Sequence, residues 1–248
     1  MSSLEIKDLQ KHFGGVRAVN GVSFQIESGN RLGIIGPNGA GKTTLLNLLT
    51  GQLKPTDGKI LLNDDDITSL HDFERAEKNI ARTFQQTNIY NGLTVHENTR
   101  LAIQQRMGIT QSIFPISRYT NLKKSVDKLL TKHNLIEHAN SQVANLAYGV
   151  RRHLELVLAL ALESSMLFLD EPTAGMTPNQ TQKMIKLIDQ IPEDIAICIV
   201  EHDLDVVFSL ADRILVLHHG KIIAENDPEN IKKNTRVQDV YLGKHLNT

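Results

Sequence analysis

The sequence predicts an α/β fold, with a parallel sheet at its core and a mainly helical segment inserted in the middle of the chain. Three features of the pattern support this prediction. Short β-like runs alternate with turn signals over the first sixty residues, apolar residues recur at helical spacing over residues 94–146, and strand-like and helix-like runs alternate again after residue 154. Such alternation of strands and helices favours a parallel α/β core.

The N-terminal β-like runs are separated by residue pairs that favour turns. The predicted strands cover residues 4–9, 22–26, 32–35 and 59–62. The turn signals between them are Gly14-Gly15, Ser28-Gly29 and Asp57-Gly58. This part of the chain therefore predicts a small sheet that leads into the glycine-rich loop after residue 35.

The middle of the chain has few turn signals. Residues such as Leu129 and Leu130 follow helical spacing and Pro115 interrupts the pattern, so we expect at least two helices. Further on, a helix-like run over residues 154–162 precedes three buried strands. These predicted strands cover residues 166–169, 195–200 and 214–217. The tail from Asn226 onward is polar and helix-like.

The charge balance and the single cysteine exclude several classes of protein. The 248 residues carry 27 Lys and Arg against 28 Asp and Glu, whereas a protein that binds nucleic acid through its phosphates usually has a basic surface. The apolar runs are far shorter than the roughly 20 residues that span a bilayer, and the charged start does not fit a secretory signal. Cys198 lies in an apolar run, which predicts a small buried strand residue. We therefore expect a cytoplasmic, reduced protein that does not bind nucleic acid.

A glycine-rich loop follows the third predicted strand and fits the pattern G-x-x-x-x-G-K-[ST]. Its residues are Gly36, Pro37, Asn38, Gly39, Ala40, Gly41, Lys42, Thr43 and Thr44. Glycines in such a loop expose backbone N–H groups to phosphates, and the N-terminal end of the next helix adds positive potential. Lys42 would reach the β- and γ-phosphates, Thr43 would ligate Mg²⁺, and Thr44 would support the phosphates beside it. The alternative is an ordinary glycine-rich turn, while a dinucleotide loop does not fit the glycine spacing.

Two carboxylates, Asp170 and Glu171, follow the apolar strand at residues 166–169. Taken alone, this pattern also fits a solvated strand end. Together with a phosphate loop in the same core, it predicts that Asp170 holds Mg²⁺ opposite Thr43 and that Glu171 polarises an attacking water.

Histidines occur after two other strands. His202 follows the predicted strand at residues 195–200, and although a lone histidine is usually a surface or packed residue, this position favours a contact with the γ-phosphate. His218 and His219 precede Gly220 in a predicted hairpin turn. They lack the partner spacing of a metal site, so we assign them no function.

The order of these motifs resembles that of the nucleotide-binding subunits of ABC transporters, over nearly the full chain. The motifs, in order, are Phe13, the phosphate loop, Gln85, a signature region at residues 146–152, Asp170-Glu171, a turn at residues 174–178 and His202. Some segments look most like the ATPase subunits of branched-chain amino acid importers. These are residues 82–85, 93–95, 171–176, 201–204 and 241–243. Urea or amide importers and the lipopolysaccharide-exporting ATPase share parts of the pattern.

The resemblance implies a phosphate-loop NTPase fold in a single ABC ATPase domain over residues 1–248. Residues 1–87 and 163–248 would form the nucleotide-binding α/β core, together with an antiparallel β subdomain. Residues 88–162 would form an inserted α-helical subdomain that includes the signature region.

The resemblance also implies roles for individual residues. Phe13 would stack on adenine, and Gln85 would link the Mg²⁺ ion or the attacking water to the helical subdomain. His202 would hold the γ-phosphate and orient the water beside Glu171. Catalysis would then rest on positioning and charge stabilisation.

In this family two ATPase subunits close head to tail, so that each ATP lies between one subunit's phosphate loop and the other's signature helix. Tyr148 and Gly149 would therefore face the ATP of the partner subunit. The usual signature begins Leu-Ser, whereas residues 146–150 read Leu-Ala-Tyr-Gly-Val. Ala147 lacks the hydroxyl that reaches the γ-phosphate, so we expect a weakened site. This departure favours a heterodimer with unequal ATP sites.

The predicted function is ATP hydrolysis, with ATP and Mg²⁺ as cofactors, that drives uptake of branched-chain or related amino acids. The chain would lie at the cytoplasmic face of the cell membrane on separate permease subunits, and a periplasmic or extracellular binding protein would take part indirectly. Alternatives are another ABC transporter, such as a urea or amide importer or a lipopolysaccharide exporter, and a regulatory ATP-binding subunit with little turnover. A soluble ABC ATPase acting on nucleic acid or ribosomes usually carries two sets of motifs, and a kinase does not explain Gln85, Gly149 and His202 in this order.

Overall fold

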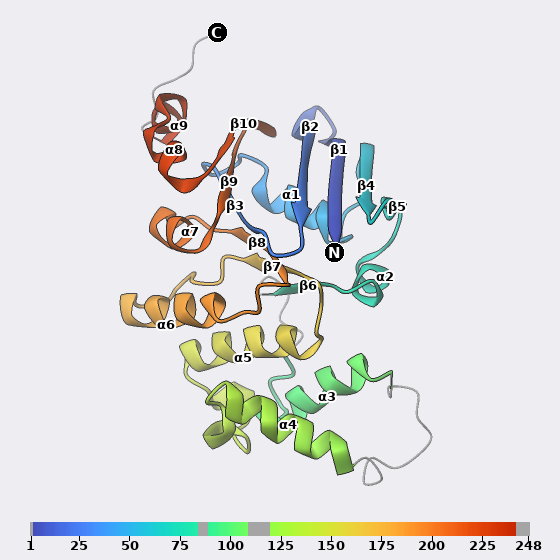
Figure 1. Cartoon of the computed structure of the whole chain (residues 1–248), viewed down its shortest axis with the longest axis vertical. Coiled ribbons are helices and arrows are strands. Elements are labelled where there is room, and N and C mark those ends of the chain that lie inside the picture. Colours follow the sequence, from blue (N-terminus) through green and yellow to red (C-terminus); the bar gives the residue numbers. More distant parts are fainter. Residues whose placement is uncertain (1, 84–88, 109–119, 242–248) are drawn as a thin grey trace. The chain divides into compact units, whose positions relative to one another are not determined.

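The computed structural model describes residues 2–83, 89–108 and 120–241 (Figure 1). The chain divides into two compact units. One unit comprises residues 1–82 and 165–248, and the other comprises residues 83–164.

The first unit contains a four-stranded antiparallel sheet in the order β2-β1-β4-β5. Its strands are β1 (Ser3–Phe13), β2 (Val16–Glu27), β4 (Asp57–Leu62) and β5 (Asp65–Asp66). The predicted turn at Gly14-Gly15 joins β1 to β2, and both strands are longer than their apolar patterns indicated. The antiparallel β sheet that the family resemblance implies is therefore present.

The turn predicted at Asp57-Gly58 is wrong, because both residues belong to β4. Gly58 has a φ of 90°, and the register between β1 and β4 shifts between Lys7 and Gln10. A Cβ atom at Gly58 would lie 2.4 Å from the carbonyl oxygen of Asp8. The glycine therefore marks a bulge with a close backbone approach, not a chain reversal.

The first unit also contains a six-stranded sheet in the order β10-β9-β3-β8-β7-β6. Its strands are β3 (Arg31–Ile35), β6 (Ile80–Thr83), β7 (Met166–Asp170), β8 (Ala196–Val200), β9 (Arg213–His218) and β10 (Lys221–Asn226). The pairs β9–β3, β3–β8 and β8–β7 are parallel, which confirms the predicted parallel core. β9 and β10 form an antiparallel hairpin at the predicted turn before Gly220.

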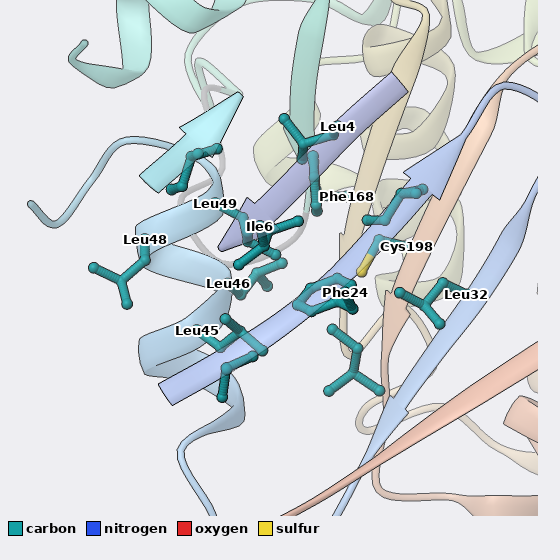
Figure 2. Packing of buried hydrophobic residues seen from close by; sticks show 14 of the residues in the cluster. Leu4, Ile6, Phe24, Leu32, Leu45, Leu46, Leu48, Leu49, Phe168 and Cys198 are labelled. Carbon is teal, nitrogen blue, oxygen red and sulfur yellow. The ribbon is translucent and has the colours of Figure 1, made fainter. Parts of the chain in front are cut away.

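Alternate residues of β3 face two separate hydrophobic cores. Leu32 and Ile34 pack in a core with helix α1 (Lys42–Leu49) and the four-stranded sheet. Figure 2 shows Cys198 in this core, which confirms its predicted burial. Ile35 points the other way, into a core with helices α7 (Leu204–Leu210), α8 (Pro228–Lys233) and α9 (Thr235–Tyr241).

Two more helices belong to this unit, α2 (Asp72–Glu77) and α6 (Pro178–Asp189). Helix α6 begins at a proline preceded by Thr177, whose side chain forms a capping box with Gln180. The helices α8 and α9 confirm the helical character predicted after Asn226.

The second unit is helical. It contains α3 (Val95–Arg106), α4 (Thr120–Lys132) and α5 (Tyr148–Ala161), with short 3₁₀ turns at Ile136–His138 and Val143–Asn145. Thr94 and Glu97 form a capping box that starts α3. The expectation of at least two helices is therefore confirmed, while Pro115 lies outside the described residues. Across the described residues of both units, no helix is long and apolar enough to cross a membrane.

Candidate nucleotide site

The predicted phosphate loop lies between β3 and α1. Gly36, Gly39 and Gly41 have positive φ angles of 153°, 77° and 104°. A Cβ atom at Gly36 would lie 2.2 Å from the carbonyl oxygen of Leu217, and one at Gly41 would lie 2.2 Å from that of Ala18. The neighbouring backbone leaves no room for side chains at these two positions, so only glycine fits there.

The hairpin between β9 and β10 supports the loop. The N–H of Gly220 donates to the carbonyl oxygen of Ala40 at 2.9 Å, and the carbonyl of Gly220 accepts from the N–H of Asn20 at 2.8 Å. His219 and Gly220 have φ angles of 47° and 74°, as expected for a two-residue hairpin turn. One of these hydrogen bonds therefore ties the hairpin turn to the loop, and the other ties it to β2.

Lys42 is the first residue of α1, and its side chain turns back over the loop. Its Nζ donates to the carbonyl oxygens of Gly36 and Pro37, at 2.6 Å and 3.1 Å, and the residue is only 5% exposed. Burial lowers the pKa of the amine, and the carboxylate of Glu171 opposes that shift. The charge of Lys42 is therefore held inside the loop and interacts with Glu171.

A cavity of about 340 Å³ opens on the loop, which is a volume typical of ligand pockets. Its lining comes from the start of β2, the loop, the start of α1 and two histidines. These residues are Val16, Arg17, Ala18, Asn38, Gly39, Ala40, Gly41, Lys42, Thr43, Thr44, His202 and His219. The fold therefore brings His202 together with most of the predicted phosphate loop.

Phe13, the predicted adenine contact, is not one of the lining residues of this cavity. It is the last residue of β1, its side chain is 49% exposed, and the Nζ atom of Lys11 lies 5.3 Å from the centre of its ring. Gln85 lies outside the described residues.

Asp170 is the last residue of β7 and is buried, in an ion pair with Arg82 of β6. Their closest atoms, Oδ2 of Asp170 and Nη2 of Arg82, are 2.8 Å apart. Burial raises the pKa of Asp170, and the charge of Arg82 counteracts the shift. The Nη1 atom of Arg82 donates to the side-chain oxygens of Asn47 at 2.6 Å and Gln52 at 2.5 Å. Arg82 therefore connects the end of β7 to the segment that follows the phosphate loop.

Glu171 and His202 contact each other at the carboxyl ends of the neighbouring parallel strands β7 and β8. The Nε2 atom of His202 lies 2.8 Å from Oε1 of Glu171. Glu171 has a φ of 49°, and its N–H donates to the carbonyl oxygen of Val200 at 2.8 Å. The two residues predicted to act on the same water are thus within hydrogen-bonding distance.

The signature residues lie in the helical unit, at the start of α5. Ala147 occupies the N-cap position, and no side chain caps the helix there. The hydroxyl of Tyr148, the first residue of α5, accepts a hydrogen bond from Nε of Arg152 at 2.9 Å, and Gly149 follows in the first turn. The first-turn N–H groups of α5 therefore lack the side-chain acceptor that a serine would supply at position 147.

Sequence reasoning did not identify Arg82, Arg17, His219 or Glu201 as residues of this region. An arginine inside the apolar strand β6 was a usable signal, because a buried cation needs an anionic partner. Glu201 similarly follows an apolar strand and is buried. The hairpin turn at His219 was predicted from the local sequence, but no local pattern indicated that this turn, or Arg17 of β2, would lie beside the phosphate loop.

The fold and the site define a phosphate-loop nucleotide-binding protein, with the loop after β3 and two carboxylates after β7. Comparison with known proteins identifies the family. The model of the ABC transporter family matches residues 19–174, so the chain belongs to this family. It is the ATP-binding subunit of an ABC transporter, an ATPase that drives transport.

Curated relatives and solved structures match over almost the whole chain. The high-affinity branched-chain amino acid transport ATP-binding protein LivG of Escherichia coli (strain K12) is 36% identical, with 97% of each chain covered. The lipopolysaccharide export system ATP-binding protein LptB of Haemophilus influenzae is 31% identical, with 99% of each chain covered. The crystal structure of the ADP conformation of an ATP-binding cassette of an ABC transporter is 29% identical, covers 98% of this chain and 99% of its own, and has a TM-score of 0.85.

Proposed function

We propose that this ATPase drives uptake of branched-chain or related amino acids and acts at the cytoplasmic face of the membrane, on separate permease subunits. A periplasmic or extracellular binding protein would deliver the substrate. Similarity to LivG, whose name describes high-affinity branched-chain amino acid transport, supports the substrate class. The observation that carries the catalytic role is the cavity shared by the phosphate loop and His202, with Glu171 in contact with that histidine.

The proposed roles follow from these positions. The loop N–H groups and the charge of Lys42 bind the β- and γ-phosphates of ATP. Glu171 accepts a proton from the attacking water, while His202 contacts the γ-phosphate and orients Glu171 through their 2.8 Å contact. Hydrolysis then depends on positioning and on charge stabilisation of the transferred phosphoryl group. Phe13 remains the proposed adenine contact, since this residue is half exposed.

The side chains of Thr43 and Asp170 suit Mg²⁺, which prefers hard oxygen ligands and keeps several waters. Thr43 lines the cavity, and one carboxylate oxygen of Asp170 is bound to Arg82. Bound Mg²⁺ would neutralise charge on the phosphates. Gln85 would link this site to the helical subdomain.

We propose further that the subdomain predicted at residues 88–162 corresponds to the compact unit of residues 83–164 and receives the permease subunits. Its α5 would present Tyr148 and Gly149 to the ATP bound by a second ATPase subunit. Because Ala147 supplies no hydroxyl, that ATP would lose one hydrogen bond, worth about 1.5–3 kcal/mol for a charged acceptor. A heterodimer with unequal sites follows, in which the competent site combines this chain's loop with the partner's signature.

Reconstitution with the permease and binding subunits tests the proposal. Radiolabelled leucine should accumulate in vesicles only with ATP, and Glu171→Gln should bind ATP but lose turnover and uptake. Uptake that continues with Glu171→Gln would refute the catalytic role. ATP-dependent transport of another solute, with no leucine uptake, would refute the substrate class.

The heterodimer has a separate test. The purified chain alone should hydrolyse ATP more slowly than the assembled transporter, and Ala147→Ser should raise its rate. Full activity of the chain alone, with Ala147→Ser no faster, would exclude unequal sites.

A second candidate is favoured by the similarity to LptB, whose name describes lipopolysaccharide export. In that case the same ATPase site would serve a different permease, as it would in a urea or amide importer. A third candidate, a regulatory subunit that binds ATP with little turnover, is favoured by Ala147 and Val150 in the signature. No change in the transporter's turnover with Glu171→Gln would support this third candidate.

A further inference from the structure

The carboxylate of Glu201 is buried beside the site, and the proposed chemistry does not use it. Glu201 follows β8 directly and is 3% exposed. A buried carboxylate is stable only where hydrogen-bond donors replace the water that it loses. The donors of Glu201 come from the two segments that carry Glu171 and His202.

Three hydrogen bonds reach this carboxylate. Its Oε1 atom accepts from the N–H of Thr173 at 2.9 Å and from the hydroxyl of the same residue at 2.6 Å. Its Oε2 atom accepts from the N–H of His202 at 3.0 Å. Hydrogen bonds to a charged acceptor are stronger than neutral ones, so Glu201 ties the turn after β7 to the segment after β8.

The turn after β7 needs such an anchor. The φ of 49° at Glu171 lies in the left-handed region, which disfavours residues other than glycine. Among the described residues, three backbone bonds hold the turn: from Glu171 N–H to the Val200 carbonyl at 2.8 Å, from Ala174 N–H to the Glu171 carbonyl at 3.1 Å and from Met176 N–H to the Thr173 carbonyl at 3.1 Å. The N–H and the hydroxyl of Thr173 are held by Glu201. The conformation at Glu171 therefore depends on its surroundings.

The side chains of Glu171 and His202 are themselves poorly confined. They are 37% and 47% exposed, so packing alone does not set the 2.8 Å contact between them. Their relative position follows from the two backbone segments, and Glu201 is hydrogen-bonded to both.

We infer that Glu201 and Thr173 are positioning residues, whose hydrogen bonds set the geometry of the Glu171–His202 pair and thereby the rate of hydrolysis. This inference rests on the proposed roles of Glu171 and His202. Neither Glu201 nor Thr173 lines the cavity, so ATP binding should depend little on them.

The test uses the full-length chain assembled with its partner ATPase and permease subunits. Thr173→Val removes the hydroxyl donor at nearly constant volume, and Glu201→Gln removes the charge. Thr99→Val is the matched control, because it removes a buried hydroxyl that donates to the carbonyl oxygen of Val95 within α3 of the helical unit. We expect Thr173→Val and Glu201→Gln to lower kcat about ten- to a hundredfold, with the KM for ATP within about twofold of wild type. Thr99→Val should leave both constants within about twofold of wild type.

A double-mutant cycle separates positioning from general destabilisation. His202→Gln should lower kcat by a smaller factor in the Thr173→Val background than in wild type, because the pair is already misplaced. Equal factors in the two backgrounds would overturn the inference, as would a kcat for Thr173→Val equal to that of Thr99→Val. If Glu201→Gln does not fold, comparison of Thr173→Val with Thr99→Val still tests the inference.

Turnover of Glu171→Gln, measured beside these variants, distinguishes failure of this inference from failure of the proposed function. Turnover that survives Glu171→Gln would refute the catalytic role itself. Turnover that is lost in Glu171→Gln but unchanged in Thr173→Val would refute only the positioning role.

Discussion

At the scale of single residues, the contacts around the site join parts of the chain that are distant in sequence. Arg82 and Asp170 are 88 residues apart, and their side chains are 8% and 5% exposed. The pair therefore differs from surface ion pairs, which water and salt screen strongly. Each charge of the pair stabilises the other, because burying either the guanidinium or the carboxylate without its partner would cost free energy.

This dependence predicts the effect of Arg82→Met. The substitution would leave the carboxylate of Asp170 buried without its cation, so we expect the free energy of unfolding to fall by about 3–5 kcal/mol. Urea denaturation followed by circular dichroism measures the change. Arg31→Met is the control, because its partner Asp189 is 68% exposed, and we expect a cost of about 1 kcal/mol or less. Equal losses in the two variants would show that burial of the pair is unimportant.

From the residues alone, single-residue contacts were predictable only where the pattern is contiguous, whereas the family resemblance also placed Glu171 and His202 beside the same water. The phosphate loop could be predicted because its glycines, Lys42 and Thr43 follow one another directly, and the burial of Cys198 followed from its apolar neighbours. The pairing of Arg82 with Asp170 and of Glu201 with Thr173 could not, since these partners are distant in the chain and only the sheet order brings them together. The sequence also did not predict that the cavity would be lined by Arg17 and His219.

At the scale of secondary-structure elements, the phosphate loop is shaped by what packs around it. Carbonyl groups of β2 and β9 lie so close to Gly41 and Gly36 that a Cβ atom at either position would collide with them. Gly39 differs, since a Cβ atom there would have no neighbour within 4 Å. The element boundaries were predicted less well than the elements, because β1 and β2 continue beyond their apolar residues and Gly58 lies in a bulge.

Alanine substitutions should separate these two kinds of glycine. Gly39→Ala meets only the backbone cost of its positive φ, about 1–2 kcal/mol in the free energy of unfolding. Gly41→Ala has a similar cost and must also displace the Ala18 carbonyl, so we expect a larger loss of stability. Urea denaturation of both variants measures the difference, and a larger loss for Gly39→Ala would contradict the packing argument.

Helix α5 carries a histidine that should make stability depend on pH. Burial, with smaller effects from His133 and His138, lowers the pKa of His153 from 6.5 to about 4. Between these values the unfolded chain binds the proton and the folded chain does not, so stability present above pH 6.5 is lost as the pH falls towards 4. The free energy of unfolding therefore rises with pH over this range. In His153→Gln we expect that slope to be smaller by up to about 1.4 kcal/mol per pH unit. Urea unfolding at several pH values between 4.5 and 7.5 measures it, and an unchanged slope would mean that His153 does not contribute.

At the scale of the whole molecule, the division of the chain into two compact units separates two parts of the proposed site. The phosphate loop, Asp170, Glu171 and His202 belong to the unit of residues 1–82 and 165–248, whereas Tyr148 and Gly149 belong to the unit of residues 83–164. Each unit has its own hydrophobic core among the described residues. The change from turn-rich to helical periodicity made this insertion predictable from sequence, and the family resemblance implied one core from both ends of the chain, while the order of the strands in the sheet came from the structure.

Because the two units have separate hydrophobic cores, a core substitution in one unit should destabilise mainly that unit. Leu130 in α4 and Leu46 in α1 are both fully buried, so replacing either with alanine should cost about 2–5 kcal/mol through lost contacts and a residual cavity. Leu130→Ala should leave the affinity for a fluorescent ATP analogue within about twofold of wild type, because its core contains no residue of the phosphate loop. Leu46→Ala should weaken that affinity, since Leu46 and Ala40 of the loop belong to the same core.

Hydrogen exchange locates each effect. With Leu130→Ala, faster amide exchange should be confined to residues 89–108 and 120–164, whereas Leu46→Ala should accelerate exchange in β3, α1 and β7. ATP hydrolysis by the assembled transporter should fall with Leu130→Ala even though the chain still binds ATP, because α5 must be ordered to present Gly149 to the partner's nucleotide. Exchange that rises equally throughout the chain in both variants would show that the two units unfold together. It would contradict the proposal that one unit can bind ATP while the unit that presents Gly149 is destabilised.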